Sequence, residues 1–198
     1  RWALGMGDAN CYNRGANTGK NTSGFAGTTP DVIPLIADKY IENDMPRGWI
    51  LPNDGYGCGY TKLDSVVVEL RKRGFHTGLW TENGVEKMAR EVGEYGSRLC
   101  KLDVAWIGEG YKFGIDGCKS AYNGIENNSD ARGFVWSVCG WAGSHRNTVM
   151  WTGDQKGTWD YIRWHIPTVI GSGLSAQNCA TGDVDGIFGG SDKTFTRD

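Results

Sequence analysis

The sequence has no long apolar run, no cluster of basic residues and no paired-cysteine motif. Its longest apolar stretches, such as IPTVIG at 166–171, are far too short to cross a bilayer, so we expect no membrane span. The 21 Lys and Arg residues nearly balance the 23 Asp and Glu residues, giving a formal net charge of -2. Because no stripe or long run of like charge stands out, we expect no nucleic-acid partner.

Other absences exclude classes of chemistry. The six cysteines are widely spaced without C-x-x-C, and the three histidines form no pair at helical spacing, so we expect no metal site. Cys100 and Cys139 sit in or beside apolar runs and are predicted to be small buried hydrophobes, while disulfides stay open for the other four. The chain also lacks a dinucleotide-binding G-x-G-x-x-G turn, a phosphate loop and a Ser-His-Asp pattern, and we expect no cofactor.

Glycine and tryptophan are abundant instead, with 31 Gly and 9 Trp. Many glycines stand beside Trp, Tyr, Asp and Asn in loop-like stretches. Planar aromatic side chains next to polar groups that bind hydroxyls suit a site that stacks on sugar rings. The alternative, that Trp fills a core and Gly makes turns, stays open for each single residue.

Apolar periodicity predicts alternating strands and helices. The predicted strands cover 1–7, 47–53, 75–81, 98–104, 132–138, 147–152 and 173–183. The predicted helices cover 29–44, 61–74, 83–96, 158–171 and, more weakly because Gly and Asn interrupt it, 117–127. This α/β alternation favours a parallel sheet, either a (β/α)8 TIM barrel of which the chain holds strands one to seven, or a doubly wound open sheet.

Two helices and one link give sharper expectations. The helix at 61–74 places Leu63, Val66, Val67 and Leu70 on one face and ends at Gly74. The helix at 158–171 is expected to pack through an apolar face, with a kink at its proline; the residues concerned are Trp159, Ile162, Ile166, Val169, Ile170 and Pro167. The link 139–147 is too short for an ordinary crossover helix.

Nearly every predicted strand ends on a carboxylate: Asp8, Asp54 after Asn53, Glu82, Asp103, Asp154 and Asp183. In a barrel these ends share the face where catalysis occurs. Like charges crowded together destabilise a fold, so their recurrence favours a functional site. Single members have simpler explanations: Asp103 can pair with Lys101, Asp54 can favour a turn, and Asp154 can cap the helix that begins near Gly157.

Carboxylates among aromatic residues, without basic residues for phosphate, suit glycoside chemistry. One carboxylate attacks or stabilises the anomeric carbon while the other protonates the departing oxygen. A divalent-cation site is the competing use of clustered carboxylates. The density of Trp favours sugar over metal.

The motifs KLDVAW, GWAGSHRNTVMWTGDQKGTW and TGDVDGIFGG, in that order, resemble glycoside hydrolase family 31. This family contains α-glucosidases, α-xylosidases and α-transglucosylases on a TIM barrel. The segments GWILPNDGYGCGYTKLDSV, GLWTENGVEKM and LSAQNCATGDVDGIFGG resemble its branch of isomaltosyltransferases and cycloalternan-forming enzymes. The resemblance runs along essentially the whole chain. It implies that residues 1–198 form a partial catalytic barrel of a larger enzyme, with strand eight and the flanking β-domains beyond this chain.

The resemblance also assigns roles residue by residue. It implies that Asp103 is the catalytic nucleophile and Asp154 the acid/base. Asp183 matches an acid that binds sugar hydroxyls, with Asp185 as the alternative. The remaining substrate-binding candidates are Asp54, Glu82, Trp106, Trp136, Arg146 and Trp151, and Trp141 is a further loop tryptophan for stacking.

The chain departs from the family pattern at two positions. Val138 stands where most members carry an Arg, and Lys101 replaces the usual Trp two residues before the nucleophile. These departures imply a site for one sugar unit that differs from that of an ordinary maltase. We therefore expect a retaining transglycosylase that transfers isomaltosyl units of α-glucans, including closure of a cyclic tetrasaccharide. Alternatives are a hydrolase of α-glucan or cycloalternan and a catalytically inactive carbohydrate-binding module. The family context leads us to expect a secreted protein.

Overall fold

The computed structural model describes residues 6–10, 29–54, 60–80, 85–103 and 110–183. Seven strands form one sheet in which every neighbouring pair is parallel and the spatial order follows the sequence order. The strands are β1 (Met6–Asn10), β2 (Trp49–Asp54), β3 (His76–Trp80), β4 (Leu99–Leu102), β5 (Val135–Ser137), β6 (Thr148–Trp151) and β7 (Ala180–Thr181). Sequential parallel order is the barrel alternative predicted above, and it excludes a doubly wound sheet, whose strand order reverses.

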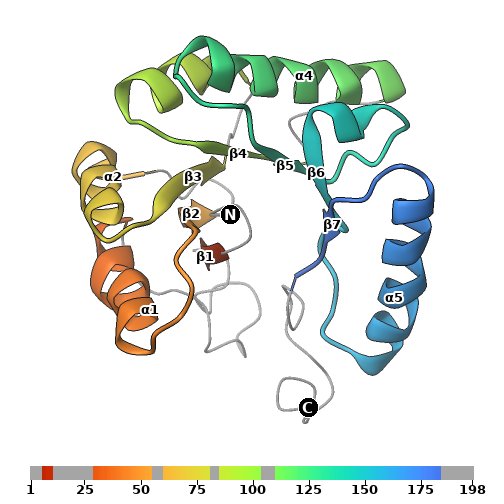
Figure 1. The fold of residues 1–198 in the computed structure, drawn as a ribbon, viewed down its shortest axis with the longest axis horizontal. Helices are drawn as coiled ribbons and strands as arrows, with labels where there is room; N and C mark the ends of the chain where they lie inside the picture. The colour runs from red at the N-terminus through yellow and green to blue at the C-terminus, as the bar shows by residue number, and fades with distance from the viewer. Residues whose placement is uncertain (1–5, 11–28, 55–59, 81–84, 104–109, 184–198) are drawn as a thin grey trace.

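The helices lie around the outside of the curved sheet (Figure 1). Four are α-helical: α1 (Asp38–Glu42), α2 (Leu63–Lys72), α4 (Tyr111–Asn127) and α5 (Trp159–Leu174). The other helical turns among the described residues are 3-10 or π-helical: η3 (Thr29–Asp31), η4 (Ile33–Ala37), η5 (Val85–Lys87), η6 (Ala89–Glu94) and η7 (Ser144–Arg146). The predicted helices at 29–44 and 83–96 are therefore each divided between 3-10, π and, in the first, α-helical turns.

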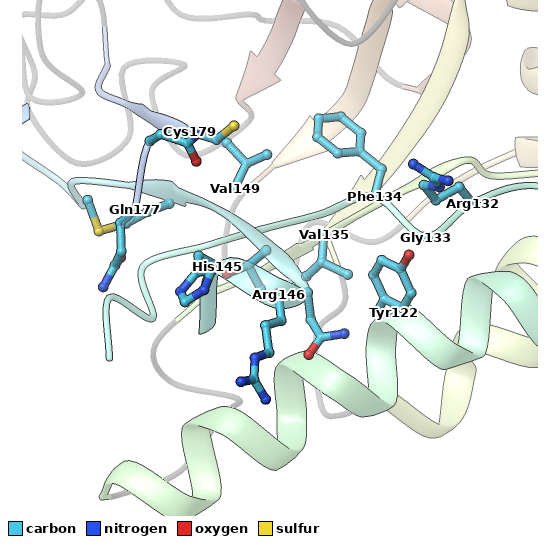
Figure 2. Close-up of a pocket in the computed structure, with 14 residues that line it drawn as sticks. Tyr122, Arg132, Gly133, Phe134, Val135, His145, Arg146, Val149, Gln177 and Cys179 are labelled. Atoms are coloured by element: carbon cyan, nitrogen blue, oxygen red, sulfur yellow. The ribbon is translucent and has the colours of Figure 1, made fainter. Parts of the chain in front are cut away.

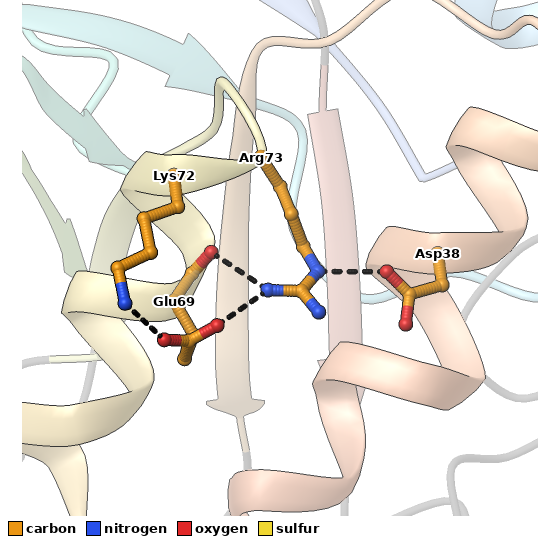
Figure 3. A network of polar contacts seen from close by, with 4 residues as sticks. All are labelled: Asp38, Glu69, Lys72 and Arg73. Atoms are coloured by element: carbon orange, nitrogen blue, oxygen red, sulfur yellow. Dashed lines mark hydrogen bonds and ion pairs between the residues drawn. The ribbon is translucent and has the colours of Figure 1, made fainter.

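Helix α2 confirms its predicted face. Leu63, Val66, Val67 and Leu70 are all buried, and Gly74 adopts φ +85° just beyond the helix end, where a left-handed residue closes a helix at least cost. On the outer side, Arg73 donates from Nε to Asp38 Oδ1 of α1 and from Nη1 to Glu69 Oε2, both at 2.7 Å (Figure 3). These ion pairs join α1 to α2.

The two faces of the sheet carry different cores. The face away from the helices is lined by the cluster of Trp49, Leu51, Trp80, Leu99, Trp136 and Trp151, which contains no helical residue. The other face packs on the helices: Ile50 joins Val32, Val66 and Leu70, for example. Burying each large apolar side chain stabilises the fold by about 1.5–3 kcal/mol, so both layers hold the sheet in its curved form.

Helix α4 is longer and more regular than the sequence indicated. It runs without interruption through Gly114, Gly117 and Gly124, although glycine costs about 1 kcal/mol in a helix. The reason is visible at Gly124, where a Cβ atom would lie 2.7 Å from Cβ of Met88. The glycine lets α4 approach the residue that precedes η6.

The link from β5 to β6 confirms the expectation that it holds no crossover helix. Within residues 138–147 the only helical turn is η7. Gln177 supports this link by donating from Nε2 to the carbonyl oxygen of Gly140 at 2.5 Å. The outer face of β5 and β6 is therefore covered by a loop and by α4 rather than by a helix of its own.

Helix α5 forms as predicted, with Pro167 inside it, but its apolar face is not buried. Trp159 is 41% exposed, Ile166 56% and Ile170 59%, while Ile162 and Val169 are half-buried. The expectation of a buried face is wrong for this part of the chain. The helix meets the sheet instead through polar and aromatic residues of its first half, which are described with the site.

Two kinds of feature do not occur among the described residues. No helix there combines the length and the apolar character needed to cross a membrane. In the same part of the chain, no group of three or more His, Cys, Asp or Glu side chains is arranged to hold a metal ion.

Candidate functional site

Three of the predicted carboxylates follow the carboxyl ends of parallel strands of the one sheet. Asp103 comes directly after β4, Asp154 comes three residues after β6, and Asp183 comes two residues after β7. Because all strands run the same way, these residues are delivered to one edge of the sheet. That edge is where barrel enzymes build their active sites.

The alternation along β4 sets the direction of Asp103. Leu99 belongs to the inner cluster, whereas Cys100 and Leu102 pack in the outer cluster against α4. Lys101 also faces inward, because its ammonium lies over the rings of two inner tryptophans. Successive side chains of a strand alternate. Asp103, the half-buried residue directly after β4, has the register position of Leu99 and Lys101, from which we expect an inward direction.

Asp154 lies on an exposed turn whose backbone is held on both sides. Before it, Gly153 adopts φ +84°, and a Cβ atom there would lie 3.7 Å from Cγ1 of Val138. After it, buried Gln155 donates from Nε2 to the backbone oxygen of Asp183 at 3.0 Å. The hydrogen bond joins the turn that carries Asp154 to the segment that carries Asp183.

The cap of α5 is Thr158, not Asp154. The Thr158 hydroxyl accepts a hydrogen bond from the backbone N–H of Tyr161 at 3.1 Å, the usual arrangement at a helix N-cap. The explanation of Asp154 as the helix cap is therefore wrong, and this carboxylate stands ahead of the helix.

A short chain of polar contacts anchors α5 to this edge of the sheet. The hydroxyl groups of Thr152 and Tyr161 lie 2.8 Å apart, and the Tyr161 hydroxyl lies 3.0 Å from Nδ1 of His165. Gly182 permits the approach, since a Cβ atom there would lie 2.5 Å from Cε1 of His165. Sequence reasoning did not single out Tyr161 and His165, although their i, i+4 spacing on one helix was a usable signal.

Trp136 and Trp151 lie in the inner core, not on an open surface. They are 3% and 1% exposed, and their ring centroids lie 5.2 Å apart. A sugar ring cannot stack on side chains covered this completely, so burial argues against Trp136 as a stacking platform and against direct sugar contact for Trp151. Trp141 is different: it is 50% exposed and makes an edge contact with Tyr111 at 5.9 Å between ring centroids.

Lys101 is the charged member of the inner cluster. Only 2% of this residue is exposed, and its Nζ lies 4.8 Å from the ring centroid of Trp136 and 4.4 Å from that of Trp151. An ammonium over aromatic faces is attracted by the ring quadrupole. Sequence reasoning identified Lys101 as a departure from the family pattern but did not foresee this position.

Arg146 lies at the other end of the sheet. It closes η7 and precedes β6 by two residues, whereas Asp154 follows the same strand. Figure 2 shows it beside His145 at a cavity of about 390 Å³, which also includes Arg132. A strand therefore separates Arg146 from Asp154, and the substrate-binding role of Arg146 stays a prediction.

The other candidates stay predictions. Asp54 is the last residue of β2, and its side chain lies outside what the structure describes. Glu82, Trp106 and Asp185 lie outside the described residues altogether. The choice between Asp183 and Asp185 is accordingly still open.

Two buried thiols interact behind β4 and β5. The hydrogen bond from Cys118 lowers the pKa of Cys139 to about 7, and donating that hydrogen bond raises the pKa of Cys118. None of Cys100, Cys118, Cys139 and Cys179 takes part in a disulfide. The prediction that Cys100 and Cys139 are buried is confirmed. The possibility of a disulfide, which the sequence left open for Cys118 and for Cys179, is excluded for both.

Comparison with known proteins supports the barrel and finds similarity to glycoside hydrolases. Residues 111–197 match the family model described as "Glycosyl hydrolases family 31 TIM-barrel domain". A curated relative, the "Probable glucan 1,3-alpha-glucosidase" of Oryza sativa subsp. japonica, is 40% identical over 58 residues, which is 29% of this chain and 6% of that protein. The "Glucosidase 2 subunit alpha" of Schizosaccharomyces pombe is 34% identical over 73 residues, covering 36% of this chain and 8% of that protein.

Among solved structures, the cycloalternan-degrading enzyme from Trueperella pyogenes in complex with isomaltose aligns with a TM-score of 0.72 at 12% identity. The alignment covers 98% of this chain and 40% of that one. At this identity the likeness shows the fold alone, and it confirms the TIM-barrel prediction. The chain spans well under half of the relatives that it matches.

Proposed function

We propose, from the premise that residues 111–197 carry the glycoside hydrolase family 31 barrel domain, that the full enzyme is a retaining α-glycoside transglycosylase acting on α-glucans. The single observation that carries the proposal is that Asp103 directly follows β4 and Asp154 follows β6, at the same edge of one parallel sheet. Glycosidases use two carboxylic acids, one as the nucleophile and one as the acid/base.

In the proposed mechanism, Asp103 attacks the anomeric carbon of an α-glucosyl unit and forms a covalent ester. Asp154 gives its proton to the departing glycosidic oxygen, so the bond to the leaving sugar breaks as the bond to Asp103 forms. Asp154 then takes a proton from the acceptor hydroxyl, whose oxygen displaces Asp103. Two displacements retain the α configuration, and they require carboxyl groups roughly 5–5.5 Å apart in the complete site.

For the donor we propose an isomaltosyl unit, with transfer within one chain closing a cyclic tetrasaccharide. The sequence resemblance to the isomaltosyltransferase branch supports this choice. So does the absence of the family's usual Arg: Val138 occupies its place, and the Val138 side chain packs near Gly153 beside the acid/base. An apolar residue there removes a cation from the sugar site.

A hydrolase of α-glucan or cycloalternan is the second candidate. The observation that favours it is the likeness of this barrel to the enzyme from Trueperella pyogenes solved "in complex with cycloalternan". Hydrolysis and transfer share both carboxylates and differ only in whether water or a sugar hydroxyl attacks the ester.

Product analysis separates these candidates. The full-length enzyme is incubated with a glucan of alternating α-1,6 and α-1,3 linkages, and early products are resolved by chromatography. A transferase yields cyclic tetrasaccharide and lengthened chains, whereas a hydrolase yields isomaltose or glucose first. A protein that binds the glucan without turnover would be the third candidate, a carbohydrate-binding module.

The nucleophile is tested by Asp103→Ala. We expect turnover to be abolished while glucan binding, measured by calorimetry, is retained. Asp130→Ala is the matched control, because Asp130 is an exposed carboxylate beyond α4. Near-normal activity of Asp103→Ala would refute the assignment.

We also propose that the enzyme acts outside the cell, since a polymeric glucan cannot cross a membrane before it is shortened. Comparing activity in the culture medium with activity in the cell lysate tests this. Activity confined to the lysate would contradict it.

A further inference from the structure

Lys101 occupies a position where a charge is costly. It is 2% exposed and lies on the inner face of β4 among tryptophans. Removing an ammonium from water is unfavourable unless nearby groups compensate for the lost hydration. An apolar residue would pack in this core without that cost. We therefore infer that the charge of Lys101 has a role in the site.

The ammonium is fixed from two sides. Trp136 of β5 and Trp151 of β6 place their ring centroids 4.8 Å and 4.4 Å from Nζ, and both rings are almost fully buried. Contacts with both rings hold Nζ in place from two strands at once. The side chain therefore extends from β4 across β5 to β6, the strand that leads to Asp154.

The position relative to the proposed nucleophile follows from the strand. Lys101 and Asp103 are two residues apart on one face, so their Cα atoms are separated by about 6.6 Å. In a site lined by aromatic rings, water screens charges weakly, and the attraction between an ammonium and a carboxylate is stronger than at a surface. Asp103 is the carboxylate nearest to Lys101 along the chain and shares its strand, so it is the carboxylate on which we expect the positive charge to act.

Other charges at this edge oppose that effect. Asp154 after β6 and Asp183 after β7 are negative when ionised. Each of them disfavours a further negative charge on Asp103. The neighbouring rings on β5 and β6 are neutral, which leaves Lys101 as the cation that faces this edge from the inner cluster among the described residues.

We propose that Lys101 is a positioning residue for Asp103: its ammonium, held between Trp136 and Trp151, keeps the nucleophile ionised and directed at the anomeric carbon. The inference rests on the proposed function and adds to it the source of the nucleophile's charge. The cation compensates for the crowding of acids at this edge of the sheet.

The test isolates the first chemical step. A fluorinated α-glucosyl fluoride reacts with the full-length enzyme by attack of Asp103 on the anomeric carbon, and fluoride leaves with the electrons of its bond. Fluoride needs no proton, so the acid limb of the rate of covalent labelling reports the ionisation of the nucleophile alone. Labelling is followed by mass spectrometry between about pH 3 and pH 8.

We expect Lys101→Met to move this acid limb to higher pH by about one to two units, the usual effect of one nearby charge. At a fixed pH within the acid limb, the labelling rate then falls about tenfold for each pH unit by which the limb moves. Lys101→Arg, which keeps the charge, restores most of the wild-type limb. Lys119→Met, at an exposed lysine of α4, removes the same charge from the surface and leaves the limb unchanged.

An unmoved limb in a folded Lys101→Met enzyme overturns the proposal, because a merely structural lysine would change stability and not this profile. If that variant does not fold, Lys101→Gln is the second neutral substitution. If neither folds, the unmodified enzyme decides: a limb with its midpoint above about pH 4, the ordinary value for aspartic acid, overturns the proposal. Labelling of another residue, with full activity of Asp103→Ala, would instead refute the proposed function.

Discussion

Gln155, which directly follows Asp154, donates a hydrogen bond from Nε2 to the backbone oxygen of Asp183 at 3.0 Å. The contact joins the segments that follow β6 and β7, and Gln155 itself is buried. The turn carrying the proposed acid/base is thus held against the segment carrying a proposed sugar-binding acid. The two residues are separated by the whole of α5, so tertiary structure alone brings them together.

We predict that Gln155→Ala lowers kcat/KM about tenfold or more, because a misplaced acid/base loses its alignment with the glycosidic oxygen. The lost hydrogen bond costs about 1 kcal/mol of stability. Gln177→Ala is the matched control, since buried Gln177 makes a comparable bond to the Gly140 oxygen in the β5–β6 link. Equal losses of activity in the two variants would show that general loosening, and not placement of Asp154, is responsible.

We predict that Asp154→Ala slows cleavage of an unactivated glucan by about 10²–10⁴-fold, the usual contribution of a positioned acid. Cleavage of α-glucosyl fluoride should be slowed far less in its first step, because fluoride departs without a proton. Single-turnover kinetics on the two substrates measures the difference. Equal slowing on both would mean that Asp154 acts on something other than the leaving oxygen.

The sequence predicted the alternating elements and most of their positions, because apolar periodicity reports directly on burial. Helix α2 is the clearest case, with its four predicted residues buried and Gly74 beyond its end. Strand ends were predictable for the same reason: Asp103 follows the last buried residue of β4. The family resemblance added roles to positions that periodicity had already located.

Periodicity could not predict how completely the tryptophans are buried. Alternation says that Trp136 and Trp151 share a face with other inner residues, but it does not distinguish a packed interior from an open mouth. Arg146 shows a second limit, because it was assigned by its place in a motif and not by the end of the strand on which it lies. One four-residue strand, β6, separates it from Asp154.

The exposed face of α5 shows a third limit. Its periodicity correctly predicted a helix, yet Trp164 is 72% exposed and Leu174 86%. An apolar stripe indicates that a face is to be covered, and it does not say whether the cover comes from the same segment of chain. The sheet meets α5 through Tyr161 and His165 instead.

We predict that Gly124→Ala destabilises the protein by about 1–3 kcal/mol, although alanine is the better helix former. The added methyl group would lie 2.7 Å from Cβ of Met88, and overpacking of this kind forces neighbouring elements apart. Gly171→Ala in α5 is the matched control: a Cβ atom there would meet no other atom within 4 Å, so the substitution should stabilise by about 0.5–1 kcal/mol. Thermal unfolding should show a lower midpoint for Gly124→Ala and a higher midpoint for Gly171→Ala. Equal shifts of the two midpoints would contradict the close approach of α4 to Met88.

The last prediction tests whether Trp151 is a core residue or a surface on which a sugar stacks. Trp151→Ala should destabilise the protein by about 3–5 kcal/mol, because it removes one of the largest fully buried side chains. Trp164→Ala, on the exposed face of α5, should change stability by less than about 0.5 kcal/mol if that face stays open in the full-length enzyme. Stability is measured by thermal unfolding and KM by initial rates. If Trp151 were instead a surface on which a sugar stacks, its removal would raise KM while leaving the unfolding midpoint in place. That result would reopen the role that burial now excludes, and it would also remove one of the two rings that hold the Lys101 ammonium.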